Sequence, residues 1–246
     1  MAMSDGPLEL SVVVPVFNEA ENILPLAAEI DAALAGGGIA FEILYVDDGS
    51  HDETPARLAE ARRRYARLRS IRFKRNCGQS TAIREGVKAA RGRLIATLDG
   101  DGQNDPADIP KLLAVFPKDL SPSPLIAGLR RKRQDNWLRR ISSRIANQIR
   151  SLILDDQTPD TGCSLKIFER DAFLDLPFFD HMHRFLPALF RRAGREVVMV
   201  DVNHRKRARG VSKYGVSNRL WIGIVDLFGV LWLQRRQKSP EIIKED

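Results

Sequence analysis

Short apolar segments alternate with amphipathic segments along the first half of this chain, and this alternation restricts the fold more than any other feature. The first apolar segment, Leu10–Val16 (LSVVVPV), is rich in β-branched residues, which is typical of a strand buried on both faces. Strands separated by helices indicate an α/β fold with a mostly parallel sheet. Further strands are expected at residues 41–46, 70–73, 94–98 and 125–128, and helices at residues 21–34, 53–65, 80–90 and 106–116.

The alternation weakens in the second half of the chain. Apolar residues from Trp137 to Leu152 recur at helical spacing, with arginines on the other faces, and predict a helix. Strands are expected at residues 163–168 and 197–202, a polar basic loop at 204–217, and an apolar helical segment at 220–233.

The length of 246 residues and the hydrophobic content of 43% suit one large domain with an appendage. We expect this domain at residues 8–217, an interfacial helix at 218–236 and a flexible tail at 237–246. Cys77 and Cys163 lack the spacing of metal ligands, and a disulfide framework is not expected. The cysteine usage therefore favours a reducing, cytosolic location, and the first ten residues, MAMSDGPLEL, do not resemble a signal peptide.

Charge is distributed unevenly along the chain. The net charge is +7, but residues 1–60 contain twelve acidic residues and one basic residue, for a net charge of −11. The remainder therefore carries +18. This asymmetry predicts an anionic partner for the later part: a nucleic acid, a phosphate compound or a lipid surface.

Polar side chains follow the first five expected strands, at the point where each strand ends. Ligands of an open parallel sheet bind beyond the carboxyl ends of its strands. Each cluster alone fits a turn, but five on one edge indicate a binding site. The clusters are Phe17-Asn18-Glu19, Asp47-Asp48-Gly49-Ser50, Asn76-Cys77-Gly78-Gln79, Asp99-Gly100-Asp101-Gly102-Gln103 and Arg130-Arg131.

The spacing of Asp99 and Asp101 places both carboxylates on one face of an extended segment. Carboxylates are natural ligands of Mg²⁺ or Mn²⁺, whose remaining ligands often come from substrate phosphates. An Asp-Gly turn is the structural alternative. The apolar strand that precedes the pair favours a metal–diphosphate site.

Two other clusters allow more than one interpretation. Asp47 and Asp48 directly follow an apolar strand, where uncompensated charge is costly, and we expect them to accept hydrogen bonds from a nucleoside. Ser50 and Asp52 fit a turn and helix cap at least as well. The basic segment HRKRARGVSKY, at residues 204–214, suits either a nucleic-acid patch or a loop that grips phosphates.

The ordered set of motifs resembles a known enzyme family. The segment around Phe17-Asn18-Glu19, VDDGS, Asn-x-Gly at 76–78 and DGDGQ are together similar to family-2 glycosyltransferases of the GT-A fold. The later DTGCSLKIF and HRKRARGVSKYG resemble the polyprenyl-phosphate branch, which includes dolichyl-phosphate mannosyltransferases and bacterial undecaprenyl-phosphate glycosyltransferases. The resemblance spans residues 8–236.

This resemblance implies an activity and a role for individual residues. The implied reaction is an inverting, metal-dependent transfer of a sugar from GDP-mannose or a UDP-sugar to a membrane polyprenyl phosphate, in cell-envelope glycan or lipid modification. The implied nucleotide-sugar-binding residues are Pro15, Phe17, Glu19, Asp47, Asp48, Asn76, Asp99 and Arg130, and the implied ligands of Mg²⁺ or Mn²⁺ are Asp99, Asp101 and Gln103. The residues implied to bind the phosphate and the acceptor are Arg130, Arg131, Arg207, Ser212 and Lys213. The implied catalytic residues are Asp101, Asp160, Arg207 and Lys213.

One departure from the family pattern concerns the metal loop. Many members have Ala or Leu where this chain has Gly100 and Gly102, so we expect a more pliable loop with an intact ligand set. For Asp160, a plain loop or cap aspartate is the alternative to a role near the acceptor.

The apolar segment at residues 220–233 is too short to span a bilayer and contains Asp226. Trp221 and Trp232 near its ends, with Arg235 and Arg236 after it, favour a helix lying in the headgroup region. We therefore expect monotopic attachment at the cytoplasmic face of the membrane. A buried core helix is the alternative.

Two rival functions stay open at this stage. A family-2 transferase could glycosylate a saccharide, although a neutral acceptor does not require so basic a loop. A nucleic-acid-binding module would account for the net charge, although the acidic strand ends would repel phosphates unless metal is bound. The sugar, the base and the oligomeric state, including a homo-oligomer, are left open by the sequence.

Overall fold

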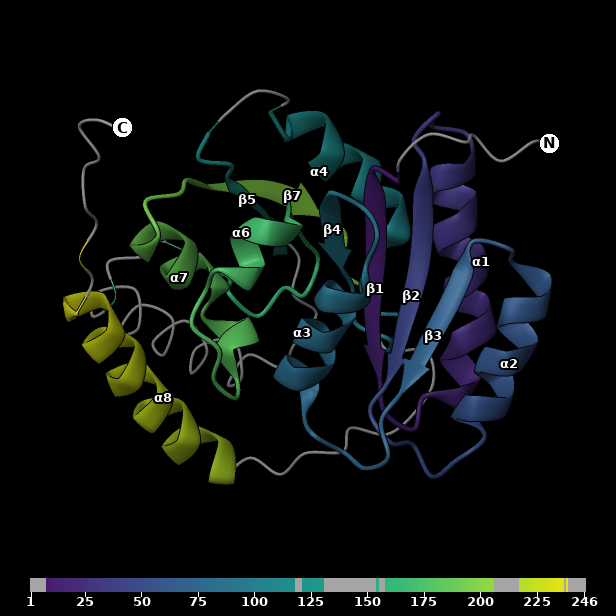
Figure 1. The fold of residues 1–246 in the computed structure, drawn as a ribbon, viewed down its shortest axis with the longest axis horizontal. Coiled ribbons are helices and arrows are strands. Elements are labelled where there is room, and N and C mark those ends of the chain that lie inside the picture. The colour runs from purple at the N-terminus through teal and green to yellow at the C-terminus, as the bar shows by residue number, and fades with distance from the viewer. Residues whose placement is uncertain are drawn as a thin grey trace, which may run out of the picture.

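The computed structural model describes residues 8–117, 121–130, 154, 158–205, 217–236 and 238, with the backbone alone for 217–222. Its described strands form one seven-stranded sheet with helices on both faces (Figure 1). The strands are β1 (Leu10–Val16), β2 (Phe41–Asp47), β3 (Leu68–Arg72), β4 (Leu94–Thr97), β5 (Leu125–Arg130), β6 (Lys166–Glu169) and β7 (Val197–Val202). Their order across the sheet is β3-β2-β1-β4-β6-β5-β7.

Six of these strands run in one direction and β6 runs in the other. β1 pairs in parallel with β2 and β4, β2 with β3, and β5 with β7. β6 lies antiparallel between β4 and β5. The predicted α/β fold with a mostly parallel sheet is therefore confirmed. The reversal of β6 places the loop before it, rather than after it, at the edge where the other strands end.

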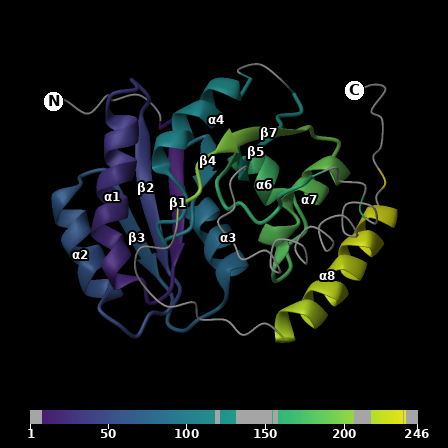
Figure 2. The same ribbon diagram turned by 180° about the vertical axis from the view of Figure 1, so that it is seen from behind.

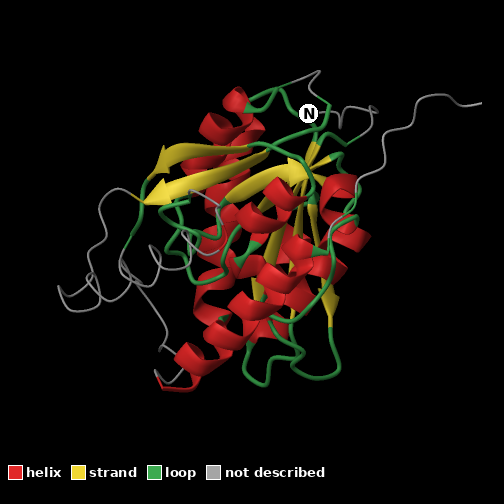
Figure 3. Ribbon diagram, turned by 90° about the vertical axis from the view of Figure 1, so that its left-hand side faces the viewer, coloured by secondary structure: helices red, strands yellow, loops and turns green. Residues whose placement is uncertain are grey.

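Helices cover the two faces of the sheet, as the opposite views in Figures 1 and 2 and the side view in Figure 3 show. They are α1 (Ala20–Ala35), α2 (Thr54–Arg64), α3 (Gln79–Ala89), η1 (Pro106–Asp108), α4 (Ile109–Val115), α6 (Arg170–Leu174), η2 (Met182–Arg184), α7 (Leu186–Arg192) and α8 (Ser217–Arg235). Val12 and Val14 point into the core beneath α1, α2 and α4. Val13 points into the core beneath α3, α6 and α7. The continuous apolar run of β1 follows from this burial on both faces.

Most of the elements predicted in the first half of the chain are present, with bounds that shift by a residue or two. The helix expected at 106–116 begins as the 3-10 turn η1, and the strand expected at 163–168 begins only at Lys166. The sequence analysis assigned no element to residues 170–192. Three short helical elements lie there, α6, η2 and α7, and Leu186, Leu189 and Phe190 among their residues are buried.

The helix α8 is present where an apolar helical segment was expected, and its two sides differ. Val230 is fully buried, and Leu227 and Leu231 pack beside it against the same core as α3 and α7. On the other side, Phe228 is 61% exposed and Trp232 is 58% exposed. The helix is therefore neither a buried core helix nor detached from the domain.

None of the helices in the described ranges combines the length and apolar character needed to cross a bilayer. The expected helix from Trp137 to Leu152, most of the basic loop and the expected tail, residue 238 excepted, lie outside the described residues.

Candidate active site

The parallel strands place their carboxyl ends, and the loops that follow, along one edge of the sheet. Neighbouring registers bring the end of β1 beside the end of β2, since Val16 pairs with Asp47. The start of β6 meets the end of β4, since Thr97 pairs with Lys166. The polar clusters of the sequence are thus gathered at one edge.

The loop after β1 is fastened to the loop after β2. The backbone N–H of Asn18 donates to the Ser50 hydroxyl (2.8 Å), and that of His51 donates to Asn18 Oδ1 (2.8 Å). The N–H of Glu19 donates to the hydroxyl of Thr54 at 2.9 Å. Ser50 and Thr54 thus hold Phe17-Asn18-Glu19 in place, and for Ser50 a structural role was the alternative that the sequence offered.

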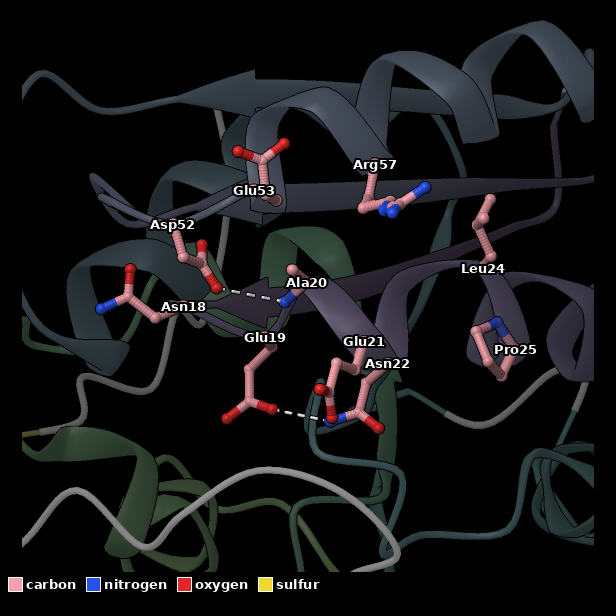
Figure 4. A pocket seen from close by; sticks show the side chains of 10 residues that line it. All are labelled: Asn18, Glu19, Ala20, Glu21, Asn22, Leu24, Pro25, Asp52, Glu53 and Arg57. Carbon is pink, nitrogen blue, oxygen red and sulfur yellow. Dashed lines mark hydrogen bonds between the residues drawn. The ribbon is translucent and has the colours of Figure 1, made fainter.

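An acidic hollow lies outside these ties, at the beginnings of α1 and α2 (Figure 4). Glu19 Oε2 accepts from Asn22 Nδ2 at 2.7 Å, and Asp52 Oδ2 accepts from the N–H of Ala20 at 3.4 Å. Phe17 meets the His51 ring edge-on, with centroids 6.2 Å apart. Of the residues expected to bind the nucleotide, Glu19 lines this hollow, while Pro15 lies half-buried in β1.

Asp47 and Asp48 are both buried, and both are engaged within the protein. Asp47 Oδ1 accepts from the N–H of Ser50 at 2.9 Å, and Arg72 Nε lies 3.1 Å from Asp47 Oδ2. Asp48 accepts from Asn76 Nδ2 (2.9 Å) and from the N–H groups of Cys77 (2.7 Å) and Gly78 (2.9 Å). Burial raises the pKa of Asp48 despite these hydrogen bonds. Asp48 therefore fixes the loop after β3, a contact that the sequence did not indicate.

Asp99 and Asp101 follow β4. Asp99 Oδ1 accepts from Gln79 Nε2 at 2.7 Å, and Asp101 Oδ1 accepts from the N–H of Gln103 at 3.1 Å. Burial raises the pKa of Asp99 to about 6, and the negative charge of Asp101 adds to this rise. The two carboxylates are therefore close enough to repel each other.

Close packing explains the first glycine of the loop after β4. A Cβ on Gly100 would lie 2.4 Å from Cγ1 of Val16, so a side chain cannot fit there without moving β1. Gly102 has a φ of +72°, a backbone conformation that glycine adopts readily.

Two carboxylates close enough to repel each other are a donor set suited to a divalent cation. Within the described residues, no three His, Cys, Asp or Glu side chains cluster closely enough to hold a metal alone. This fits Mg²⁺, which usually takes one or two carboxylates and completes its shell with water and substrate phosphates. Asp99, Asp101 and the amide of Gln103 fit such a site.

Arg130, at the end of β5, forms a two-pronged ion pair with Asp160. Arg130 Nε lies 2.7 Å from Asp160 Oδ2, and a terminal guanidinium nitrogen lies 2.7 Å from Oδ1. A Cβ on Gly162 would lie 2.9 Å from the guanidinium, so this glycine leaves room for Arg130. The fork geometry restrains the guanidinium more firmly than a single contact would.

Lys166 is a buried cation beneath the same loop, and the sequence analysis gave it no role. Its ammonium donates to the carbonyl oxygens of Thr161 and Cys163. Burial lowers its pKa, although Cys163, Asp99 and Asp160 oppose this. A lysine between the apolar residues Leu165 and Ile167 was the available signal. Arg131, Arg207, Ser212 and Lys213 lie outside the described residues.

Comparison with known proteins identifies the family. The sequence model described as "Glycosyl transferase family 2" matches residues 11–176. The chain belongs to glycosyl transferase family 2. The predicted resemblance is thereby confirmed, and the nucleic-acid-binding alternative gains no support.

The names of several relatives include a polyprenyl phosphate. The chain is 39% identical to dodecaprenyl-phosphate galacturonate synthase of Rhizobium johnstonii over 241 residues, covering 95% of this chain and 69% of the relative. It is 32% identical to undecaprenyl-phosphate 4-deoxy-4-formamido-L-arabinose transferase of Aeromonas hydrophila, covering 85% of this chain and 64% of the relative. The corresponding transferase of Enterobacter sp. is 35% identical, with 84% and 62% covered. The chain thus spans just under two thirds of these two transferases.

Solved structures with low sequence identity share the fold of this family-2 glycosyltransferase. Glucosyl-3-phosphoglycerate synthase from Mycobacterium tuberculosis, in complex with Mn²⁺, UDP and glucosyl-3-phosphoglycerate, gives a TM-score of 0.69 at 16% identity, covering 94% of this chain and 81% of that one. Mannosyl-3-phosphoglycerate synthase from Rubrobacter xylanophilus gives 0.69 at 16%, covering 97% and 79%. The GT-A fold is confirmed.

Proposed function

We propose that this protein transfers a sugar from a nucleotide-sugar, GDP-mannose or a UDP-sugar, to a polyprenyl phosphate at the membrane, for cell-envelope glycan or lipid modification. The observation that carries the proposal is the meeting, at one edge of the sheet, of a carboxylate pair suited to a metal–diphosphate with an arginine held rigidly by Asp160. The polyprenyl-phosphate names of the relatives support this acceptor.

The donor would occupy the loops after β1 to β4. Asp99, Asp101 and Gln103 would hold Mg²⁺ or Mn²⁺, and the bound cation would offset the charge that develops on the departing diphosphate. Because Asp47 and Asp48 already have partners within the protein, we assign them a supporting role. They would shape the nucleotide pocket by fixing residues 50 and 76–78, with Phe17 and Glu19 on its other side.

The acceptor phosphate would lie beside Arg130. Because both carboxylate oxygens of Asp160 are paired with this arginine, Asp160 would act by orienting it. Arg131, Arg207, Ser212 and Lys213 would supply further positive charge and hydrogen-bond donors.

The reaction needs no strong base, because a lipid phosphate is already anionic at neutral pH. A phosphate oxygen attacks the anomeric carbon of the sugar, and a new C–O bond forms there. The bond from that carbon to the nucleoside diphosphate breaks, and its electron pair leaves with the diphosphate. One direct displacement inverts the anomeric centre. The remaining task of the protein is to bring two anions together, which the cations described above would do.

The helix α8 would rest on the membrane that contains the acceptor. Its exposed side carries Ile224, Val225, Phe228 and Trp232, hereafter the apolar stripe. Cations lie at the end of the helix: Arg235, Arg236 and Lys238 are exposed, and Arg192 of α7 donates to the carbonyl of Leu233. An apolar stripe with cations at its end is suited to the surface of an anionic leaflet, and we place this surface at the cytoplasmic face.

The test is a transfer assay with purified protein, undecaprenyl phosphate, Mg²⁺ or Mn²⁺, and a panel of radiolabelled GDP- and UDP-sugars. We expect one donor to yield a labelled lipid, and EDTA to stop its formation. Transfer to soluble oligosaccharides with none to lipid phosphate would instead establish the saccharide-acceptor alternative.

A further inference from the structure

Residues 178–184, hereafter the bridging segment, lie between the first half of α3 and the helix α8. On the α3 side, Arg84 lies over the ring of Phe178, with its guanidinium 4.3 Å from the ring centroid. On the α8 side, His181 Nδ1 lies 3.0 Å from Oδ2 of Asp226. The proposed chemistry uses no side chain of this segment, although it contains two histidines.

His183 of the bridging segment forms an enclosed pair with Ser80. His183 Nδ1 lies 2.7 Å from the Ser80 hydroxyl oxygen, and the backbone N–H of His183 donates to that same oxygen at 3.3 Å. Because the oxygen already accepts from the backbone, its single hydrogen is free to be donated to Nδ1. A neutral ring with its proton on Nε2 satisfies this arrangement, and burial keeps the ring neutral by lowering its pKa well below the usual value.

Ser80 is fully buried in the first turn of α3, next to residues that hold both acidic clusters of the donor side. Its neighbour Gln79 donates to Asp99. The preceding residues 76–78 supply three donors to Asp48. A shift of the first turn of α3 would therefore move Asp99 and Asp48 together.

The bridging segment contacts this turn a second time. A Cβ on Gly78 would lie 3.4 Å from Oδ1 of Asp180, so the segment lies directly against the loop after β3. The N–H of His181 also donates to this oxygen, at 2.8 Å. The segment thus contacts residues 76–80 at two places, through Asp180 at Gly78 and through His183 at Ser80.

We propose that His183 is a positioning residue for the nucleotide-sugar donor, which fixes the first turn of α3 through Ser80 and thereby sets the places of Asp99 and Asp48. This inference rests on the proposed function, since it takes the edge of β1 to β4 as the donor site. Outer contacts of this kind commonly change affinity by roughly 10-fold to 100-fold when they are removed.

The experiment compares two buried serines, each of which is hydrogen-bonded to a nitrogen atom of a histidine or arginine side chain. Ser80 contacts His183, and Ser123, which lies before the start of β5, accepts from Arg195 at 2.9 Å. Binding of UDP and of GDP with Mn²⁺ is measured by calorimetry for the full chain and for Ser80→Ala, His183→Ala, His183→Asn and Ser123→Ala. Thermal unfolding is recorded in parallel.

We expect Ser80→Ala and His183→Ala to weaken binding of the nucleotide that the wild type prefers by roughly 10-fold. Ser123→Ala should bind as the wild type does. His183→Asn should recover most of the affinity, because its Oδ1 can accept from Ser80 where Nδ1 did. The KM for undecaprenyl phosphate should stay unchanged in every variant.

Equal nucleotide affinity in Ser80→Ala, His183→Ala and Ser123→Ala would overturn the positioning role, even if all three unfold at lower temperature. A His183→Asn variant as weak as His183→Ala, or a parallel rise in the KM for lipid, would overturn it as well. A wild type that binds neither nucleotide with Mn²⁺ would instead remove the proposed function, and this inference with it.

Discussion

The donor side and the acceptor side of this site are built differently. On the donor side, carboxylates are held by donors from neighbouring loops, so that Asp48 alone takes three hydrogen bonds from residues 76–78. On the acceptor side, a single fork between Arg130 and Asp160 stands at the end of β5. Hydrogen bonds among four loops fix the carboxylates of the donor side, whereas one bidentate ion pair fixes the guanidinium of Arg130. Substitutions on the donor side should therefore affect the nucleotide-sugar, and substitutions on the acceptor side should affect the polyprenyl phosphate.

The largest expected effect is on the carboxylate pair. Asp101→Asn should lower transfer by about 1,000-fold, because removal of an electrostatic partner of the developing charge has effects of this order. Its thermal unfolding should match that of the wild type. The assay is transfer of radiolabelled sugar at saturating metal, with Asp175→Asn, an exposed aspartate after α6, as the control. Full activity in Asp101→Asn with metal still required would remove Asp101 from the metal site.

The next effect tests the acceptor side. Arg130→Lys keeps the charge but loses the planar fork, and should raise the KM for polyprenyl phosphate by roughly 100-fold while nucleotide binding changes little. Asp160→Asn should act in the same direction, since it frees the guanidinium to move. If either variant weakened Mn²⁺–nucleotide binding as much as acceptor use, the division into two sides would not hold.

A smaller effect is expected at the apolar stripe. Each large apolar side chain removed from a lipid surface costs about 1.5–3 kcal/mol, or roughly 10-fold or more in partitioning. Phe228→Ser with Trp232→Ser should therefore reduce sedimentation with anionic vesicles and leave soluble nucleotide binding unchanged. Val115→Ser, which changes an apolar residue 46% exposed on α4, is the control and should sediment as the wild type does. Unaltered sedimentation of the double variant would exclude α8 as the contact.

The smallest effect concerns pH. The pKa of His183 is depressed in the folded protein, so the unfolded chain takes up a proton at about pH 6.5 while the folded one does not. Its contribution to stability is therefore complete above pH 6.5 and is lost as the pH falls. The free energy of unfolding should decline by up to about 1.4 kcal/mol per pH unit more steeply in the wild type than in His183→Asn. Urea unfolding between pH 7 and 5 measures this, and parallel curves would contradict it.

The sequence predicted those parts of the fold that depend on local pattern. Seven contiguous residues identified β1, and turn residues after apolar strands identified the edge where the site lies. Residues 170–192 escaped prediction because α6, η2 and α7 are each shorter than two helical turns and show no periodicity. The direction of β6 depends on pairing with β4 and β5, which no local pattern reveals.

The sequence indicated the candidate site residues by their type, but it did not reveal which residues they bond to. Asp48, Asp99 and Asp160 were singled out because carboxylates are unusual where they stand. Their partners come from 20 to 30 residues away: Gly78 for Asp48, Gln79 for Asp99 and Arg130 for Asp160. Only the folded chain shows that Asp48 and Asp160 are hydrogen-bonded within the protein, which is why we propose that they support other residues.

The reversed strand β6 has a consequence for how such a protein can change. Because β6 begins at the edge where the other strands end, the described connection before it, at residues 158–165, lies at that edge. That connection carries both Asp160 and Gly162, which shape the surroundings of Arg130. Ser164 of the same connection donates to Asn104 Oδ1 in the loop after β4, so changes within residues 158–165 would affect both the surroundings of Arg130 and the loop that carries the carboxylate pair. A new preference for the receiving phosphate would therefore have to preserve the contact of Ser164 with Asn104.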